Sequence, residues 1–322
     1  MSTEARRVCI VFVSYNCGGD IVSLITRLKQ RAIAGYDIEY VVVDNASADD
    51  SVLQLQTIVG PDVTLVPSTE NLGFGRGCNL GFEHCQDADL VLLMNPDVEV
   101  FDDSVENLLR CSQQHPQAGI WGGVTLDHDR RPDGANAWRE PTLMHSLAWA
   151  TYADQVIMKV TGTSVAAYPK RLAEQTTPYA VDAVSGCFLL IERPLLDRLG
   201  GFDERFFMYS EEIDLCRRAR ELGARPTVCP AATLVHEGSA TVTSINRLRF
   251  MQRSRLQYFQ KHRGRAGSLA AWVLAYLGVM VRVVGFGLSS LINASSKAKL
   301  NLWRAIALDR SIWRPLPGVG EA

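Results

Sequence analysis

The chain has 322 residues, of which 47% are hydrophobic and 21% charged, and its formal net charge is −2. This composition excludes a disordered, a collagen-like or a small disulfide-stapled protein. Because chains beyond about 250 residues usually stop growing a single core, we expect two parts.

The first hundred residues alternate between strands and helices. Apolar, β-branched runs predict strands at 8–13, 38–43, 63–66 and 89–94. Amphipathic patterns predict helices near 19–33, 49–59 and 76–86. Continuous apolar strands separated by such helices indicate an α/β fold, with a mostly parallel sheet covered on both faces.

Polar residues follow each of the four predicted strands. The clusters are Ser14-Tyr15-Asn16, Asp44-Asn45-Ala46-Ser47, Asn71-Leu72-Gly73 and Asn95-Pro96-Asp97. Any one of them is typical of a turn or a helix cap. Four together predict one crevice at the carboxyl edge of the sheet, where ligands of such folds bind.

The pattern is less regular after Asp97. We expect, in chain order, a helix at 102–114, a strand at 118–126, a strand at 180–191 broken near Gly186, a helix at 209–222, and one or two short strands at 225–236. The insert at 138–178 gives no clear signal. Neither a dinucleotide fingerprint nor a phosphate-binding P-loop is present, which argues against NAD binding and P-loop nucleotide hydrolysis.

Acidic and imidazole side chains supply candidate chemistry. A carboxylate at Asp97, directly after a strand, suits Mg²⁺ or Mn²⁺, and His236 at a strand end is able to complete the coordination. Glu211, Glu212 and Asp214 begin a helix, where acids favour the dipole, but crowding of like charges also raises a pKa toward that of a general base. The aromatic residues before them, up to Tyr209, form either a wall for a sugar ring or part of the core.

Eight cysteines are present without any Cys-x-x-Cys pair. Because several lie in apolar strand-like runs, we expect buried thiols in a reducing cytosol rather than disulfides. The apolar run near the N-terminus is about six residues long and lacks a small-residue cleavage site, so we expect no signal peptide and a cytoplasmic body.

Six ordered motifs between about residues 8 and 240 resemble those of a known family. They include VFVSYN, VVVDNAS, ENLGFGRGCNLGF, LLMNPDVEV and VSGCFLLIERPLLDRLGGFDERFFMYSEEIDLCRRARELG, followed by His236. The family is that of the inverting family 2 glycosyltransferases of GT-A fold, especially the bacterial rhamnosyltransferases of O-antigen and cell-wall polysaccharide assembly.

The resemblance implies a nucleotide-sugar donor in the crevice, with dTDP-rhamnose favoured and UDP-sugars as the alternative. Residues implied near the donor nucleotide are Ser14, Tyr15, Asn16, Asp44, Asn71, Gly73, Arg76 and Asn95. The metal-binding motif of the family corresponds to Asn95-Pro96-Asp97, so Asp97 and His236 are the implied ligands of Mg²⁺ or Mn²⁺. The catalytic base falls on Glu212, with Glu211 as the runner-up. We place Gly186, Tyr209 and Asp214 on the sugar and acceptor side.

The C-terminal region, 241–322, is predicted to be separate from the GT-A domain, 1–240. Between Gly238 and Leu308 it carries eleven Lys and Arg and no acid. Within it, 269–292 is long enough to span a membrane, but Arg282 lies mid-segment on a narrow face of small residues.

Basic residues flank that segment on both sides, which favours a helix lying on an anionic membrane through 247–304, as a peripheral protein on the cytoplasmic face. Packing through the small face, in a homodimer or against the body, stays open. The resemblance implies a glycan acceptor on a polyprenyl diphosphate. Two other interpretations are a sugar-nucleotide nucleotidyltransferase and a non-catalytic protein that binds anionic lipid or nucleic acid, with nucleic acid disfavoured.

Overall fold

A computed structural model describes residues 5–236 and 244–314, which form two compact units. The first unit contains the chain up to Arg139 together with 169–207 and 211–241. The second contains 140–168, 208–210 and 242–322. The boundary predicted between 240 and 241 lies outside the described residues. The division differs from the predicted one because two earlier segments, 140–168 and 208–210, join the C-terminal helices.

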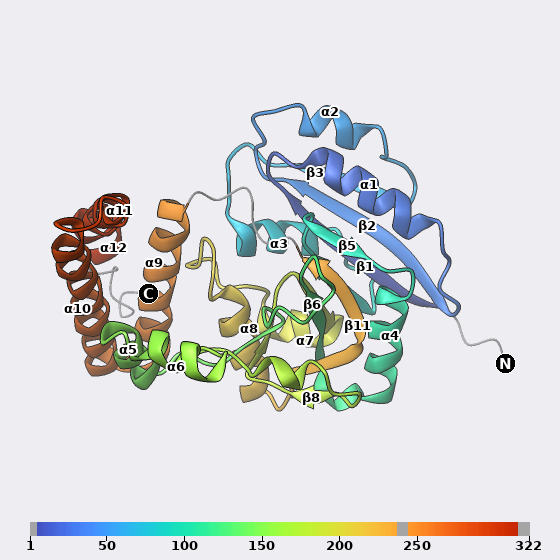
Figure 1. Cartoon of the computed structure of the whole chain (residues 1–322). Coiled ribbons are helices and arrows are strands. Elements are labelled where there is room, and N and C mark those ends of the chain that lie inside the picture. The colour runs from blue at the N-terminus through green and yellow to red at the C-terminus, as the bar shows by residue number, and fades with distance from the viewer. Residues whose placement is uncertain (1–4, 237–243, 315–322) are drawn as a thin grey trace. The chain divides into compact units, whose positions relative to one another are not determined.

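One sheet organises the first unit (Figure 1). Its strands are β1 (Arg6–Ser14), β2 (Tyr36–Asp44), β3 (Val63–Pro67), β4 (Leu90–Met94), β5 (Val98–Val100), β6 (Ile120–Leu126), β8 (Tyr179–Ala180), β10 (Phe188–Glu192) and β11 (Thr227–His236). They follow the order β3-β2-β1-β4-β10-β6-β11-β5, and β8 pairs with β11. Only β10, β5 and β8 run against the others among the described strands. The predicted α/β fold with a mostly parallel sheet is confirmed.

Helices cover both faces of this sheet. Those of the first unit are α1 (Gly18–Lys29), α2 (Ser51–Gln56), α3 (Phe74–Phe82), α4 (Ser104–Gln114), α7 (Arg193–Leu199) and α8 (Glu211–Glu221). Side chains alternate along β1, so Ile10 and Phe12 belong to the core that includes Ile21 of α1. Val11 points the other way, toward α3, where a Cβ on Gly81 would lie 2.6 Å from its Cγ1. A Cβ on Gly77 would likewise lie 3.0 Å from the Cγ1 of Val13, so these two glycines of α3 allow the helix to approach the sheet closely.

Strand register brings the predicted polar clusters together. Ser14 lies opposite Asp44 in the β1–β2 pair, and Asp44 lies opposite Pro67 in the β2–β3 pair. On the other side of the sheet, β11 runs antiparallel to β5 and places His236 opposite Val98. Asp97 precedes Val98 in the chain, so residues 139 positions apart become neighbours at the carboxyl edge.

Four cysteines form disulfides, which corrects the expectation of thiols throughout. Cys9 pairs with Cys85, and Cys111 pairs with Cys229. These partners are 76 and 118 residues apart in the chain, so they have no local spacing that could reveal them. The predicted burial is correct for three of the other four cysteines, which are free thiols.

The second unit is helical. Its elements are α5 (Leu143–Ala150), α6 (Ala153–Thr161), α9 (Ser244–His262), α10 (Gly264–Ser290), α11 (Ser296–Leu308) and α12 (Arg310–Trp313). The small face of α10 packs inside this unit, where Ala271, Ala275 and Val279 share a core with Phe259. At Gly278, a Cβ would lie 2.3 Å from the Trp149 ring of α5. This face is thus occupied within one chain.

Arg282 is buried in an aromatic cage of the second unit. Its guanidinium lies 3.9 Å from the Trp149 ring centroid and 4.4 Å from that of Tyr152. It also donates hydrogen bonds to the carbonyls of Gly278 and Trp149, at 2.8 and 3.0 Å. Cation–π contacts and two carbonyl acceptors stabilise a buried guanidinium, so this charge has a packing role.

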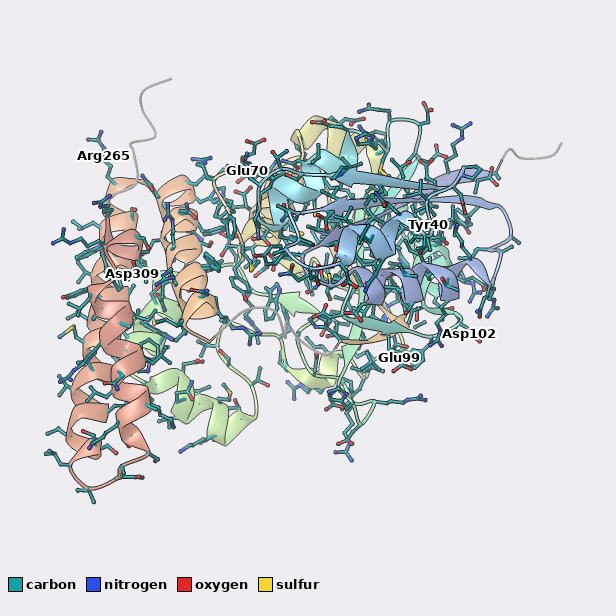
Figure 2. The ribbon with its side chains drawn as sticks, turned by 90° about the horizontal axis from the view of Figure 1, so that it is seen from above. Tyr40, Glu70, Glu99, Asp102, Arg265 and Asp309 are labelled. Atoms are coloured by element: carbon teal, nitrogen blue, oxygen red, sulfur yellow. A yellow bond between two sulfur atoms is a disulfide. The ribbon has the colours of Figure 1, made fainter. Side chains whose placement is uncertain are left out.

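The opposite face of α10 is exposed and apolar. Among described residues, α10 is the one helix long and apolar enough to cross a membrane by length and composition. Eight large apolar residues along it and just after it are at least 40% exposed: Leu269, Val273, Leu277, Val281, Val284, Leu288, Leu291 and Ile292. We call this set the apolar stripe. Arg265 projects outward from the same unit near the start of α10 (Figure 2).

Candidate active site

The donor side of the site begins at a loop that one amide organises. Asn45, directly after β2, donates from its Nδ2 to the Oδ1 of Asn71 and to the carbonyl of Gly73, both at 3.1 Å. Its Oδ1 accepts from the Leu72 N–H at 2.8 Å. Asn71 in turn accepts from the Gly73 N–H at 2.9 Å. The side chain of Asn45 therefore fixes the loop that leads into α3.

Position 73 accepts only glycine, both because of its backbone conformation and because of the atoms around it. Its φ is +79°, and a Cβ there would lie 2.1 Å from the carbonyl oxygen of Phe207. That same oxygen accepts the Phe74 N–H at 2.9 Å. The start of α3 is thus bound to the chain that leads to the acid pair at 211–212, and only glycine fits at the contact.

A second network joins the ends of β1 and β2. Asp44 accepts from the N–H and the hydroxyl of Ser47, and the Ser47 hydroxyl accepts from the Asn16 N–H at 2.9 Å. Asn16 has a φ of 57° and accepts from the Ala48 N–H at 2.8 Å. Ser14 and Asp44 are buried, whereas Tyr15 is exposed. The structure thus brings these four predicted donor residues to one corner.

Arg76 lies in the first turn of α3 and is partly exposed. It forms long ion pairs with Glu70 (labelled in Figure 2) at 3.6 Å and with Glu204 at 3.9 Å. Exposed pairs of this length contribute little free energy, so the guanidinium can exchange them for a better anion. A diphosphate is such a partner.

Asp97 and His236 face each other with open valences. The Oδ1 of Asp97 lies 3.5 Å from the Nε2 of His236. Both atoms are buried, and neither has a hydrogen-bond partner within the described part of the chain. Buried polar atoms are normally satisfied, so an oxygen and a nitrogen left open toward each other fit a divalent cation between them. Asn95 is near enough to Asp97 to favour its ionised form.

The two groups hold each other charged. Burial alone would raise the pKa of Asp97, but the neighbouring imidazole outweighs it and leaves that pKa lowered. Burial would likewise lower the pKa of His236, yet Asp97 raises it above its ordinary value. The site therefore presents an ionised carboxylate, as metal binding requires, whereas the imidazole has to lose its proton before its Nε2 can bind a cation.

Glu211 and Glu212 begin α8. Glu211 is buried and Glu212 partly buried, and one carboxylate oxygen of each, Oε2, has no hydrogen-bond partner in the described chain. Burial, aided by the neighbouring Glu212, raises the pKa of Glu211 well above its usual range. Burial raises the pKa of Glu212 to about 7, against backbone N–H groups and the Trp138 indole, which favour its ionised form. A carboxylate with a pKa near 7 suits a general base.

The surroundings of Cys187 show that Asp97 and the acid pair, Glu211 and Glu212, lie in the same part of the molecule. Burial raises the pKa of this thiol to about 12, and the negative charges of Asp97, Asp133 and Glu212 add to that effect. Next to it, a Cβ on Gly186 would lie 3.9 Å from the Cβ of Glu212. The break before β10 therefore lies beside the acid pair, and Gly186 leaves room there.

Two residues predicted on the sugar and acceptor side, Asp214 and Tyr209, have surroundings that the structure describes. Asp214 is fully buried and pairs with Arg218 at 2.7 Å, while Arg218 also donates to the carbonyls of Leu199 and Gly201. Through Arg218, this carboxylate links α8 to the preceding turn, which gives it a structural role, and its place on the acceptor side stays a prediction. Tyr209 belongs with 208–210 to the second unit, and its φ is 69°.

Sequence reasoning missed three residues of the site. Asn45 lies within the VVVDNAS motif, but no local pattern shows that its side-chain amide reaches the carbonyl of Gly73. Trp138 ends the short strand β7 (Ala137–Trp138), which pairs with β9 (Ala183–Val184), and Asp133 precedes it. Both lie at or just before the insert without clear periodicity, and only tertiary pairing brings them to Glu212 and Cys187.

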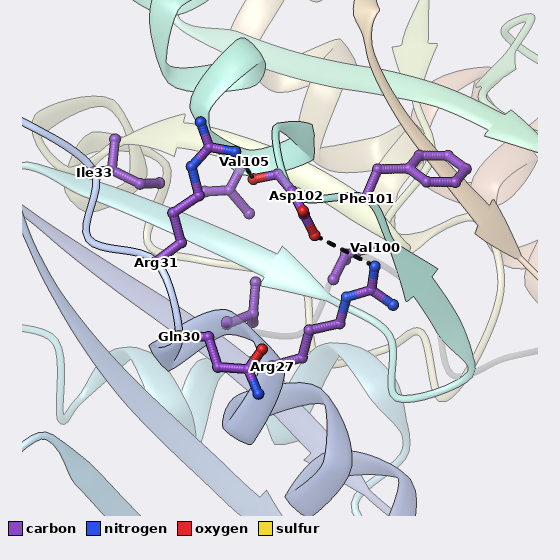
Figure 3. Close-up of a pocket in the computed structure, with 9 residues that line it drawn as sticks. Arg27, Gln30, Arg31, Ile33, Val100, Phe101, Asp102 and Val105 are labelled. Atoms are coloured by element: carbon purple, nitrogen blue, oxygen red, sulfur yellow. Dashed lines mark hydrogen bonds and ion pairs between the residues drawn. The ribbon is translucent and has the colours of Figure 1, made fainter.

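A separate cavity of about 260 Å³ lies at the C-terminal end of α1 (Figure 3). Its two arginines are already paired. Arg27 lies 3.5 Å from Asp102, and Arg31 lies 3.2 Å from Glu106. The candidate active site is therefore the carboxyl edge of the sheet.

Comparisons with known proteins point to one family. The model of glycosyl transferase family 2 matches residues 9–200. The N-acetylglucosaminyl-diphospho-decaprenol L-rhamnosyltransferase of Mycobacterium tuberculosis is 30% identical over 241 residues, which cover 70% of this chain and 75% of that protein. Rhamnosyltransferase WbbL of Escherichia coli is 25% identical over 170 residues, 51% of this chain and 60% of that one.

A solved structure shares the fold. The mannosyltransferase PcManGT from Pyrobaculum calidifontis, determined in complex with GDP-Man and Mn²⁺, superimposes with a TM-score of 0.58 at 17% identity. The match covers 97% of this chain and 88% of that one.

Proposed function

The chain belongs to glycosyl transferase family 2 and is a glycosyltransferase, and on that premise we propose that it moves L-rhamnose from dTDP-β-L-rhamnose to a hydroxyl of a lipid-linked glycan, with inversion. Membership of this family removes the nucleotidyltransferase and the non-catalytic interpretations. The observation that carries the proposal is the gathering, at the carboxyl edge of the sheet, of buried acidic and imidazole atoms that have no hydrogen-bond partner in the described part of the chain. The rhamnosyltransferase names of two relatives support the choice of sugar.

Glu212 is the proposed base. Its carboxylate takes the proton of the acceptor hydroxyl while the acceptor oxygen forms a bond to the anomeric carbon. The bond from that carbon to the diphosphate oxygen breaks at the same time, and the nucleoside diphosphate leaves with the electron pair. Attack opposite the leaving group inverts the anomeric carbon, and Arg76 is the proposed group that neutralises part of the departing charge.

Asp97 and His236 are the proposed ligands of Mg²⁺ or Mn²⁺, with Asn95 beside them. The cation would supply positive charge to the diphosphate. Their fit rests on the 3.5 Å approach of two buried atoms without hydrogen-bond partners among the described residues. Mixed oxygen and imidazole ligation suits Mn²⁺ somewhat better than Mg²⁺.

Calorimetry tests the donor. We would titrate the protein with dTDP, UDP and GDP, each with Mn²⁺, with Mg²⁺ and with EDTA. Metal-dependent preference for dTDP is the expected result. Preference for UDP would keep the enzyme class and replace the sugar, whereas failure of all three to bind would contradict the proposal.

We further propose that the acceptor is carried on a polyprenyl diphosphate and that the second unit lies on the membrane that holds it. The name of the Mycobacterium tuberculosis relative supports such an acceptor. The apolar stripe supports membrane contact, because monomeric soluble proteins rarely expose a contiguous apolar patch of this kind.

Charge favours an interfacial position on the cytoplasmic face. Arg265 precedes the apolar part of α10 and Lys297 and Lys299 follow it, and all three are exposed. A span would place the two ends on opposite sides, whereas a helix lying in an anionic leaflet keeps both basic ends in contact with headgroups. Co-sedimentation with vesicles containing 30% phosphatidylglycerol should exceed that with pure phosphatidylcholine. If the protein bound neither kind of vesicle, the proposed membrane-binding surface would be contradicted.

A further inference from the structure

The chain takes an unusual path immediately before the acid pair. Residues 208–210 join the second unit, while 207 and 211 on either side belong to the first. Tyr209 and Ser210 have φ values of 69° and 68°, so two successive residues with a Cβ adopt the left-handed region. Such conformations are costly for residues other than glycine and persist only where neighbouring contacts impose them.

Two successive carbonyl groups anchor this path. The carbonyl of Phe207 accepts the Phe74 N–H of α3 at 2.9 Å. The next carbonyl, that of Met208, accepts the hydroxyl of Ser254 at 2.7 Å. Ser254 lies in α9 and is 2% exposed, so water cannot easily replace its hydroxyl. The left-handed pair follows at once, and Glu211 and Glu212 come directly after it.

We infer that Ser254 is a positioning residue for catalysis: by binding the Met208 carbonyl, it holds the left-handed turn from which α8 presents Glu211 and Glu212. The inference rests on the proposed function of Glu212. Ser254 touches neither donor nor acceptor in this account and acts only through the backbone. Loss of its hydroxyl frees the turn to relax toward ordinary φ values, which moves the start of α8 and lets water reach the acid pair.

The test compares Ser254→Ala with a matched control. Ser112 is also buried and donates its hydroxyl to a backbone carbonyl, that of Leu109 at 2.8 Å in α4, away from the site. We expect Ser254→Ala to lower kcat about tenfold and to leave the Kd of the donor within twofold. We also expect the acid limb of the kcat profile to move to lower pH, because a better hydrated Glu212 has a lower pKa. Ser112→Ala should change none of these quantities.

Two further variants keep the inference open to refutation if Ser254→Ala folds poorly. Ser254→Thr retains a hydroxyl and should restore kcat to within threefold. Ser210→Gly accepts the left-handed conformation without strain, and its effect should not add to that of Ser254→Ala, because both act on the same turn.

The outcomes separate this inference from the proposed function. If Glu212→Gln abolishes transfer while Ser254→Ala matches Ser112→Ala in kcat and pH profile, positioning by Ser254 is wrong and the base stands. Additive effects of Ser254→Ala and Ser210→Gly would also contradict the inference. If Glu212→Gln transfers sugar normally, the proposed function itself fails.

Discussion

The ionisable groups at the carboxyl edge of the first unit's sheet differ in their hydrogen bonding from the arginine buried among the helices of the second unit. At the sheet edge, Asp97, His236, Glu211 and Glu212 each keep a buried atom without a hydrogen-bond partner in the described chain. In the second unit, Arg282 is equally buried but meets two carbonyls and aromatic rings. At the sheet edge, buried atoms without hydrogen-bond partners indicate a ligand or a reaction, whereas the hydrogen-bonded guanidinium of Arg282 indicates a packing role.

The largest effect on stability should come from removing a buried carboxylate that already has an ion-pair partner. Asp214→Asn breaks the buried pair with Arg218, and we expect a loss of about 3 kcal/mol in the free energy of unfolding. The matched change Asp97→Asn should alter stability by less than about 1 kcal/mol, because its contact with His236 is 3.5 Å long and its side chain is partly exposed. Urea unfolding measures both. Equal destabilisation by the two changes would contradict a purely structural role for Asp214 and a largely non-structural one for Asp97.

For donor binding, the two substitutions should rank in the opposite order, with Asp97→Asn having the larger effect. Asp97→Asn should abolish the dependence of donor binding on metal and lower kcat/KM by about 100-fold, or roughly 3 kcal/mol. Calorimetry with Mn²⁺ and with EDTA measures the first quantity. A donor Kd that still responds to metal would remove Asp97 from the ligand set.

Within the second unit, Arg282→Ala should cost about 2 kcal/mol in stability. The change removes the cation from the Trp149 ring and the two hydrogen bonds that the guanidinium donates to backbone carbonyls. Transfer per folded molecule should not change. A full loss of kcat with an unchanged free energy of unfolding would show that Arg282 belongs to a site after all.

The acid pair should give activity and stability opposite dependences on pH. With a pKa of about 7, Glu212 must be ionised to act, so kcat should fall about tenfold per pH unit below that value. Its folded-state pKa lies above the ordinary value of 4.5, so the folded form binds more protons and stability should fall as pH rises from about 4.5 to about 7. Glu212→Gln should flatten that fall. Stability that rises with pH in this window would contradict the raised pKa.

The smallest effect on stability is expected at the apolar stripe. Leu277→Ser and Val284→Ser alter exposed side chains, so the free energy of unfolding should change by about 0.5 kcal/mol or less. Binding to vesicles should weaken by at least tenfold for the double variant, since about 25 cal/mol per Å² of apolar surface no longer leaves water. Unchanged vesicle binding would remove the stripe from the membrane contact.

Local patterns predicted the part of the fold that local physics decides. The four strands, their helices and the polar clusters at 14–16, 44–47 and 95–97 could be predicted because apolar runs and caps are local signals. The pairing of β11 with β5, which brings His236 beside Asp97, depends on contacts across 139 residues. The resemblance to a known family, rather than spacing, indicated that partnership.

Other features had no local signal at all. The structural role of Asp214 depends on Arg218 and on two carbonyls from the preceding turn. The sequence alone therefore could not distinguish this acid from Glu211 and Glu212. The insert at 138–178 lacks clear periodicity, and the folded structure packs one of its helices, α5, on α10 from the far end of the chain. The disulfides likewise join segments that only the folded sheet brings together.

The most direct test of the account is kcat for Glu212→Gln beside the donor Kd of the same variant. We predict that kcat falls by a factor of about 10² to 10⁴ while the donor Kd stays within twofold, because the amide fills the same space but cannot accept the proton. Glu211→Gln is the matched control and should lose less. Turnover by Glu212→Gln within tenfold of the unchanged protein would show that the open carboxylate at the sheet edge is not the base.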